Sequence, residues 1–368
     1  MLIRKHLKNI TSYQPGKPIQ ELKRELGLKK VIKLASNENP FPPPLSVRKA
    51  LKKSLRELNR YPDAGGYYLK KAISKKFRTR PQNIILGNGS DEIIVLALRA
   101  WVEPDEEVIV GYPSFLIYEI QAKALGLRVV RSPLKNFRYD LEDIRKKINK
   151  KTKLIFIANP DNPNGSYLNF KEIKNFLKKI PKKVIVFFDE AYFEFAPLDF
   201  PKSIEFVKRG YNVIFTRTFS KVYGLAGLRI GYGIAKEELI QGLEKVREPF
   251  NVNSLAQISA EVALRDKKYL RKIVSYINRE KKYIYEELGK LNLNYIKSAT
   301  NFILIDLGGS CSSLKLSNYF LKRGVIIREM SPWGYKNFIR VTIGRHSENM
   351  RFIEILKKYL NSKKEERL

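Results

Sequence analysis

The chain is poor in the residues that build disulfides and zinc sites. Its 368 residues include one cysteine, Cys311, and two histidines. A single cysteine excludes a disulfide within the chain, and no cysteine cluster is present to bind zinc. We therefore expect no metal site and a reducing compartment, the cytoplasm.

Long apolar runs are also missing. The strongest one, Ile93 to Val102, is interrupted by Arg99 and is much shorter than the roughly 18 residues expected of a membrane-spanning helix. The first ten residues carry scattered charges and lack the uninterrupted apolar stretch of a secretory signal. The sequence therefore predicts no membrane partner and no secretion.

Acidic residues are scarce beside basic ones, because 37 Asp and Glu stand against 71 Lys and Arg, a formal net charge of +34. A field of this sign attracts polyanions, so nucleic-acid binding is a remote alternative function. It would require a concentrated basic stripe and an affinity that falls steeply with salt. The lysines are instead spread over nearly every helical segment, and no helix-turn-helix, zinc-finger or RNP pattern occurs. We expect no nucleic-acid partner.

Short runs of Val, Ile and Phe alternate with longer amphipathic segments, which is typical of an α/β fold. Several runs are apolar at consecutive positions, which favours strands buried on both faces of a mostly parallel sheet covered by helices. Helices are expected at 90–100, where Ser90 and Asp91 are natural N-caps, at 141–148 and at 170–179. The expected strands are Ile84–Leu86, Glu107–Val110, Arg128–Arg131, Leu154–Ala158, Val184–Phe188, Val213–Thr216 and Leu228–Gly233.

The pattern changes near Asn253. Helical spacing extends from there to Leu291 and is followed by strand-like runs at 302–307, 325–328 and 338–343, between helical patterns at 312–323 and 347–360. Length alone suggests about two domains. We expect an N-terminal segment over residues 1–31 that joins the small domain, a large domain over 32–270 and a small α+β domain over 271–368.

One lysine is set apart by its neighbours. Lys221 follows an expected buried strand, has hydroxyl groups at Thr218 and Ser220, and is followed by Arg229. A lysine so placed can form a Schiff base with an aldehyde cofactor, and the hydroxyls and the guanidinium can hold that cofactor's phosphate. In a chain so rich in lysine, this segment alone would also fit an ordinary strand end.

Polar and aromatic residues follow other strands in the same way. Asp189 ends a strongly apolar run, where a carboxylate needs a partner, either a protonated pyridine nitrogen or a structural salt bridge. Asn162 lies in a turn-rich loop, where it can donate to a phenolate oxygen or serve only the turn. Tyr112 ends a further strand and can stack on a flat ring or pack against its neighbours.

The glycine-rich turn at residues 86–89 leads into Ser90 and Asp91. Backbone N–H groups at such a helix N-terminus suit a phosphate. The turn lacks the spacing of a dinucleotide fingerprint and the lysine of a P-loop, which argues against NAD or ATP at this position.

Four segments follow one another in an order known from one enzyme family. They are Ser36-Asn-Glu-Asn-Pro40, Arg60-Tyr-Pro-Asp63, Asp189-Glu-Ala-Tyr192, and the run from Thr218-Phe-Ser-Lys221 to Ala226-Gly-Leu-Arg229. With them the chain, from Tyr13 to Arg345, resembles the pyridoxal-phosphate aminotransferases of fold type I and, within them, the histidinol-phosphate aminotransferases. The resemblance implies a three-layer fold with a mostly parallel seven-stranded sheet plus a smaller α+β domain, and pyridoxal 5'-phosphate as the cofactor.

The resemblance also implies roles. Lys221 would form the Schiff base and move a proton between the substrate carbon and the cofactor's C4′. Asp189 would pair with the pyridinium, Tyr112 would stack on the ring, and Asn162 and Tyr192 would hold the 3′-oxygen. The phosphate would be held by Ser90, Asp91, Thr218, Ser220 and Arg229, and by Tyr61 of the partner subunit in a homodimer with shared active sites.

The implied reaction is transamination between L-histidinol phosphate and 2-oxoglutarate, a step of histidine biosynthesis. Arg340 occupies the place of an arginine that usually grips a substrate carboxylate, and Arg328 matches a second arginine, so the pair suits a dianionic phosphate. Tyr13 would close over the substrate and Asn37 would contact it. For Arg328 and Tyr13, a surface charge and a packed aromatic are the plain alternatives.

Two positions depart from the family pattern, and two other enzyme classes have similar chains. Asn164 stands where Thr is usual, and Pro42 stands where Gly is common, close to where the N-terminal segment approaches the substrate. Threonine-phosphate decarboxylases would need a further carboxylate site, which the sequence does not reveal. A broader aromatic or aspartate aminotransferase would lack the second, phosphate-binding arginine.

Overall fold

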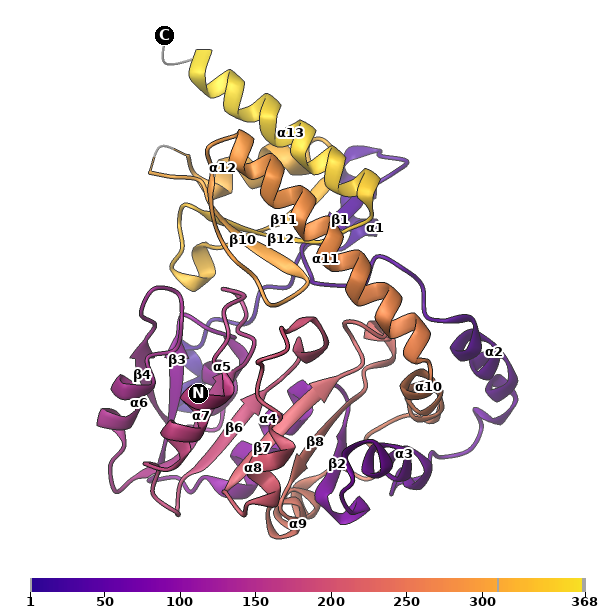
Figure 1. Cartoon of the computed structure of the whole chain (residues 1–368), viewed down its shortest axis with the longest axis vertical. Coiled ribbons are helices and arrows are strands. Elements are labelled where there is room, and N and C mark those ends of the chain that lie inside the picture. The colour runs from indigo at the N-terminus through magenta and orange to yellow at the C-terminus, as the bar shows by residue number, and fades with distance from the viewer. Residues whose placement is uncertain (1, 310, 366–368) are drawn as a thin grey trace.

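Two sheets, one large and one small, organise the chain. The computed structural model describes residues 2–309 and 311–365, and within them a seven-stranded sheet and a five-stranded sheet form two units. Helix α11 (Lys267–Lys290) runs from the side of the large unit up along the small one (Figure 1).

The large sheet is mostly parallel, as predicted. Its edge strand β2 and its neighbour β8 run antiparallel, β8 and β7 do so too, and all other neighbours are parallel. The five parallel strands therefore end at the same edge of the sheet. The spatial order is β2 (Ile84–Gly87), β8 (Gly231–Ala235), β7 (Val213–Thr218), β6 (Ile185–Asp189), β5 (Thr152–Ala158), β3 (Glu107–Tyr112) and β4 (Arg128–Pro133).

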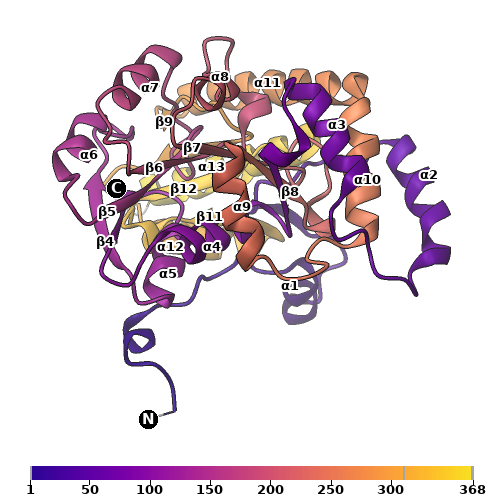
Figure 2. The ribbon, with the colours of Figure 1, turned by 90° about the horizontal axis from the view of Figure 1, so that it is seen from below.

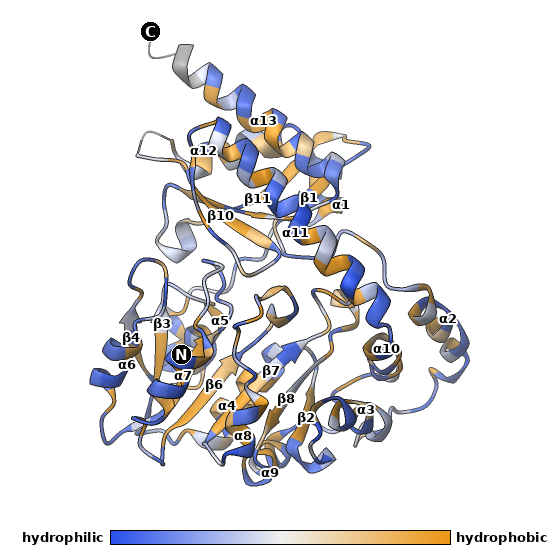
Figure 3. Cartoon of the chain, viewed as in Figure 1, coloured by the Kyte–Doolittle hydropathy of each residue, from blue (hydrophilic) through white to orange (hydrophobic). Residues whose placement is uncertain are grey.

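Apolar strands build the core of the large unit. Phe156, Phe187, Phe188 and Phe215 are buried completely or almost so, and the strands stand out as orange ribbons in Figure 3. Helices α4, α5 and α9 cover one face of the sheet and α3, α7 and α8 the other (Figure 2). A sheet enclosed on both faces requires strands that are apolar at consecutive positions, which is the pattern that the sequence carries.

The small sheet is mixed. Its order is β1 (Ile32–Leu34), β11 (Val325–Glu329), β12 (Phe338–Thr342), β10 (Phe302–Asp306) and β9 (Asn294–Ile296), with only β1 and β11 parallel. The strands expected at 302–307, 325–328 and 338–343 are confirmed. The domain division stays a prediction, to which the structure adds that β1 pairs within the small sheet and that residue 270 lies inside α11.

The helices expected at 90–100, 141–148 and 170–179 are confirmed to within two residues. The helical stretch after residue 253 is two helices, because Asn253 caps α10 and Asp266 caps α11. The helices other than α11 are α1 (Ile19–Leu26), α2 (Leu45–Ser54), α3 (Tyr67–Phe77), α4 (Ser90–Trp101), α5 (Ile117–Ala124), α6 (Leu141–Lys147), α7 (Phe170–Leu177), α8 (Ile204–Lys208), α9 (Glu237–Val246), α10 (Ser254–Arg265), α12 (Ser313–Leu321) and α13 (His346–Glu365). The short 3-10 helices are η1 (Lys5–Asn9), η2 (Leu55–Glu57), η3 (Pro81–Asn83), η4 (Phe193–Phe195), η5 (Ala226–Leu228) and η6 (Ser331–Trp333).

Two local expectations are wrong. The strand expected at 228–233 begins only at Gly231, because η5 precedes it and Arg229 adopts a left-handed conformation with φ of 54°. Ser90 and Asp91 are not N-caps, since the helix already begins at Ser90 and the cap position is Gly89, without a side-chain cap.

No helix in the described part of the chain is long and apolar enough to cross a membrane.

Candidate active site

A cavity of about 430 Å³ lies where β5, β6 and β7 end, between the large sheet and the small one. Residues of both units and of the N-terminal segment line it. The residues predicted from the sequence that line this cavity are Tyr13, Asn37, Ser90, Asp91, Asn162, Asp189, Tyr192, Thr218, Ser220, Lys221, Arg229, Arg328 and Arg340. The structure therefore gathers at one place residues that are more than 300 positions apart in the sequence.

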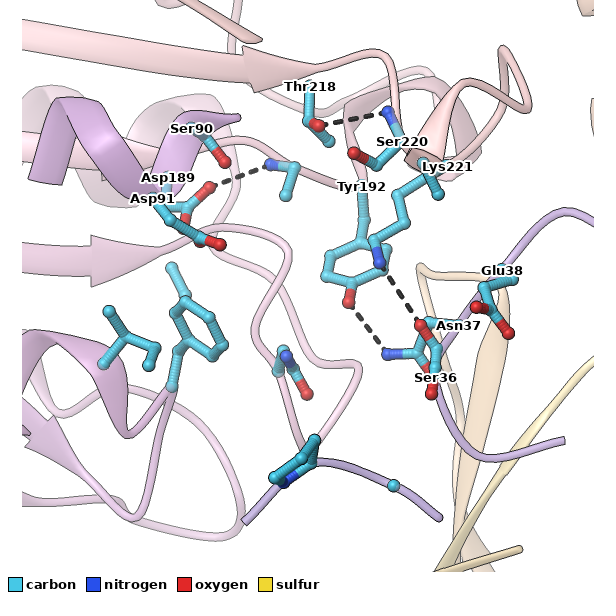
Figure 4. Close-up of a pocket in the computed structure, with 18 of the residues that line it drawn as sticks. Ser36, Asn37, Glu38, Ser90, Asp91, Asp189, Tyr192, Thr218, Ser220 and Lys221 are labelled. Atoms are coloured by element: carbon cyan, nitrogen blue, oxygen red, sulfur yellow. Dashed lines mark hydrogen bonds between the residues drawn. The ribbon is translucent and has the colours of Figure 1, made fainter. Parts of the chain in front are cut away.

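Lys221 reaches into the middle of the cavity (Figure 4). Its Nζ donates a hydrogen bond to the carbonyl of Ser36 at 3.4 Å and lies 5.8 Å from the centre of the Tyr192 ring. Burial lowers the pKa of this amine to about 8, and the nearby positive charge of Arg340 acts in the same direction. A lysine with a depressed pKa is a better nucleophile and base near neutral pH than an ordinary surface lysine.

Asp189 lies at the floor of the cavity as a buried carboxylate. It accepts hydrogen bonds from the Tyr118 hydroxyl at 2.8 Å and from the Ala191 backbone N–H at 3.2 Å. No Lys, Arg or His of the described residues lies within ion-pair distance of it, and burial raises its pKa to about 6. A cationic ring nitrogen held there would supply the missing partner, so this position fits a pyridine cofactor.

The cavity can hold an anion where α4 begins, and Ser90 and Asp91 of this helix lie beside Asp189 (Figure 4). Helix α4 begins after Gly89, whose φ is +81°, and a Cβ at this glycine would lie 2.5 Å from Nη2 of Arg229. Arg229 donates to the Ser220 hydroxyl at 3.4 Å and faces Asp91 at 3.5 Å. Thr218 accepts a hydrogen bond from the Ser220 N–H at 3.1 Å. A free helix N-terminus, two hydroxyls and a guanidinium around a glycine form a cradle for a phosphate.

Tyr192 and Asn162 also line the cavity. The Tyr192 hydroxyl accepts a hydrogen bond from the Asn37 amide at 2.8 Å, and burial raises the pKa of Tyr192, so the phenol keeps its proton. The Asn162 side-chain oxygen accepts a hydrogen bond from Arg340. Asn37 has φ of 55° and also bonds Thr342 of β12, at 2.9 Å through its N–H. Its amide is thus engaged in holding the two units together at the cavity.

Arg328 and Arg340 form the cationic wall on the small-sheet side. They face each other in the register of β11 and β12 and are 8% and 4% exposed. Arg328 donates to the carbonyl of Gln14 at 2.6 Å and Arg340 to the carbonyl of Ala35 at 3.0 Å. Neither forms an ion pair with a carboxylate of the described residues, and the Nε of each lacks a hydrogen-bond partner. Burial lowers the pKa of both guanidinium groups.

Two predicted residues do not line the cavity. Tyr112 points elsewhere, because the chain turns directly after β3 and the Arg131 guanidinium covers the tyrosine ring, 4.0 Å from its centre. Phe115, three residues later, lines the cavity instead. Tyr61 is 82% exposed and stacks on Phe250 with ring centres 4.6 Å apart, so it contributes nothing to the cavity of its own chain.

Other residues of the cavity escape prediction from the sequence. Tyr118 stands one helical turn after Phe115 and reaches Asp189, but an aromatic at this spacing indicates only a packed helix face. Glu38 and Lys33 form an ion pair of 3.3 Å among the lining residues. Pro42, the second departure, contributes its carbonyl to a hydrogen bond from Tyr269 at 2.9 Å, which holds this edge in place.

Comparison with known proteins identifies the family. A model described as aminotransferase class I and II matches residues 29–356. The histidinol-phosphate aminotransferase 2 of Carboxydothermus hydrogenoformans is 43% identical over 361 residues, which cover 98% of this chain and 99% of that protein. The histidinol-phosphate aminotransferase of Moorella thermoacetica is 42% identical over 359 residues, or 97% and 92% of the two chains. The chain belongs to the histidinol-phosphate aminotransferase family.

A solved structure of this family agrees over nearly the whole length. The crystal structure of histidinol-phosphate aminotransferase from Sinorhizobium meliloti in complex with pyridoxal-5'-phosphate has a TM-score of 0.90 and 28% identity, and 98% of each chain is covered. The fold type I architecture predicted from the sequence is thereby confirmed, and the chain is an enzyme of the aminotransferase class.

Proposed function

We propose that the protein is a pyridoxal-phosphate-dependent aminotransferase that exchanges the amino group of L-histidinol phosphate with 2-oxoglutarate. The substrate assignment rests on one observation, the pair of buried arginines Arg328 and Arg340. Two buried guanidinium groups without a carboxylate partner require an anion, and a dianionic phosphate matches two fork-shaped donors better than one carboxylate does. The names of the relatives support the same substrate.

The cavity fits the cofactor at both of its polar ends. Asp189 would face the ring nitrogen, and the cradle at Gly89 with Ser220 and Arg229 would take the phosphate. Phe115 replaces Tyr112 as the aromatic beside the ring. When bound, pyridoxal phosphate supplies an aldehyde for the substrate amine and an electron sink that acidifies the carbon bearing that amine.

Lys221 is the base of the proposed reaction. With a pKa near 8, lowered by burial and by Arg340, about a tenth of this amine is neutral at pH 7. When it is not bonded to the cofactor, the neutral amine would serve as the base that takes the proton from the substrate carbon and as the acid that gives it back at C4′. Tyr192 and Asn162 orient the ring oxygen, and Asn37 fixes the Tyr192 hydroxyl. In the second half of the reaction, Arg340 binds a carboxylate of 2-oxoglutarate.

A homodimer with shared active sites and a cytoplasmic location belong to this proposal. The exposed Tyr61, stacked on Phe250 outside its own cavity, supports the dimer, because an exposed hydroxyl at this place can reach the phosphate cradle of a partner subunit. The single cysteine fits a reducing compartment.

The two arginines provide the test. In Arg328→Ala, kcat/KM for histidinol phosphate should fall about 100-fold, because the buried phosphate of the substrate loses one of its two guanidinium partners. For an amino acid with a single carboxylate, kcat/KM should fall less than about fivefold. The half-reaction is followed through cofactor absorbance. Arg323→Ala is the matched control, since this exposed arginine lies just before β11 and packs on Tyr319.

Two results would contradict the proposal. An equal loss for both substrates in Arg328→Ala would point to a general aminotransferase. A wild-type protein that ignores histidinol phosphate but releases carbon dioxide from phosphothreonine would be a decarboxylase.

A further inference from the structure

A tryptophan of the small unit lies beneath both arginines. Trp333 in η6 is 1% exposed, and its ring centre is 5.0 Å from the guanidinium carbon of Arg328 and 6.0 Å from that of Arg340. Two cations over one indole are held by its negative π face, which partly replaces the missing carboxylate partner. Trp333 therefore supports the cationic wall from below, in addition to the hydrogen bonds that Arg328 and Arg340 donate.

Two hydrogen bonds fasten this turn of the small unit to the large unit. The Trp333 indole N–H donates to the carbonyl of Ser114, just after β3, at 2.9 Å. Two residues on, the Tyr335 hydroxyl donates to the side-chain oxygen of Asn164 at 2.9 Å. Both acceptors are buried, with Asn164 fully so. The contact thus crosses between the two units and engages a buried acceptor at each of its two hydrogen bonds.

The acceptors themselves are held by one buried carboxylate. Asp161 accepts hydrogen bonds from the Ser114 hydroxyl at 2.6 Å and from the Asn164 backbone N–H at 3.2 Å, and the Asn164 amide donates to it as well. Asn164 thereby uses its amide N–H for Asp161 and its oxygen for Tyr335. These two contacts give a structural role to Asn164, which stands where the family usually has Thr.

The same loop reaches the substrate side of the cavity. Asn162 lies between Asp161 and Asn164, lines the cavity and accepts a hydrogen bond from Arg340. Arg340 is therefore held by three contacts, namely the Asn162 oxygen, the carbonyl of Ala35 and the ring of Trp333. Loss of the Asn162 or the Trp333 contact would loosen the guanidinium and let it shift from the position that an incoming phosphate requires.

We propose that Trp333, Tyr335 and Asn164 are positioning residues that lock Arg328 and Arg340 into the geometry required for a phosphorylated substrate. This inference rests on the proposed function, since it assigns the phosphate to the arginine pair. None of the three lines the cavity, and they act through the guanidinium groups.

The Tyr335→Phe variant removes the hydrogen bond from Tyr335 to Asn164 and keeps the ring that packs on Phe137 and Phe338. We expect the KM for histidinol phosphate to rise about fivefold to tenfold, because the buried oxygen of Asn164 loses its donor. For histidinol, which has no phosphate, kcat/KM should stay within about twofold. The matched control is Tyr295→Phe, because this tyrosine of β9 in the small sheet stacks on Tyr285 and its hydroxyl forms no hydrogen bond within the described residues.

A double variant tests the pairing. If Tyr335 acts through Asn164, then Asn164→Ala and the double variant with Tyr335→Phe should raise the KM by the same factor, so the two effects are not additive. Additive effects, or an equal loss for histidinol and histidinol phosphate, would overturn the inference.

A binding measurement separates this inference from the proposed function. Inorganic phosphate is titrated calorimetrically into the cofactor-loaded wild type, Tyr335→Phe and Tyr295→Phe. Weaker phosphate binding in Tyr335→Phe alone supports the positioning role of Tyr335, whether or not histidinol phosphate is the substrate. Unchanged phosphate binding in Tyr335→Phe overturns this role. A wild type that binds phosphate but does not transaminate histidinol phosphate would instead contradict the proposed function.

Discussion

Asp189 carries a carboxyl group in a buried position, where its ionised form is unfavourable. The strand before it is buried along its whole length, and burial raises the pKa of this carboxyl to about 6. Between its ordinary pKa of 3.8 and about 6, the folded protein binds the proton more tightly than the unfolded chain does. The free energy of unfolding therefore falls as the pH rises through this window, by an amount on the order of 3 kcal/mol when the cofactor is absent.

Asp189→Asn should therefore separate stability from function. At pH 7 the cofactor-free variant should unfold at a higher urea concentration than the cofactor-free wild type, because the amide is neutral and can still bond Tyr118. The difference should vanish at about pH 4, where the wild-type carboxyl is protonated. Affinity for pyridoxal phosphate should fall in the same variant. A control is Asp105→Asn, at an exposed site, and a variant less stable than the wild type at pH 7 would contradict this account.

At the residue scale, the sequence predicts those cavity residues that follow directly from a strand. Lys221, Asp189 and Arg229 come after buried strands or within a dense motif, and all three line one cavity. Their chemical roles stay predictions. Tyr112 and Phe115 show where such prediction ends, because a strand end fixes the position of the chain but the following turn decides which aromatic faces inward.

At the scale of elements, the strand-to-helix turns shape the cavity. The turn from β2 to α4 passes through Gly89 at φ of +81°, where the space beside its Cα is taken by the Arg229 guanidinium. Only a residue without a side chain permits both the left-handed conformation and this close approach. The sequence indicates a glycine-rich turn at this place, but the arginine that fills it comes from the distant loop after η5.

Gly89→Ala should damage the phosphate cradle more than the fold. The added methyl group would displace Arg229, so the Kd for pyridoxal phosphate should rise about tenfold or more, with a loss of about 1 to 2 kcal/mol in the free energy of unfolding. Gly227→Ala is the matched control, because this glycine lies in η5 beside the cavity, has no positive φ and has nothing within 4 Å of an added Cβ. Equal cofactor affinity in both variants would show that the close approach does not matter.

At the scale of the whole molecule, the cavity exists because two units meet. Asn37, which follows β1, bonds Tyr192 of the large unit and Thr342 of the small one. The sequence predicts both sheets from their apolar runs, since burial on two faces leaves a local pattern. It does not predict that the three-residue strand β1 pairs with β11, because so short a segment has no periodicity and its partner lies nearly 300 residues away.

In the proposed dimer, the active site likewise forms where two parts meet, here two chains. If Tyr61 serves the partner's cavity, a hybrid dimer of one Lys221→Ala chain and one Tyr61→Phe chain contains one site with both defects and one intact site. The Tyr61→Phe homodimer should bind the cofactor about tenfold or more weakly, because one hydrogen bond to a charged phosphate is lost. At a cofactor concentration below that Kd, the hybrid should therefore be more active than either homodimer.

The control for the hybrid is Tyr67→Phe in place of Tyr61→Phe, because Tyr67 is another exposed tyrosine, six residues later, and packs on Tyr68. A hybrid with Tyr67→Phe should retain about half of the wild-type activity at any cofactor concentration. If Tyr61 instead served its own chain, every site of the first hybrid would carry a defect. Such a hybrid would be no more active than the Tyr61→Phe homodimer, and that result would remove the shared active site from the proposal.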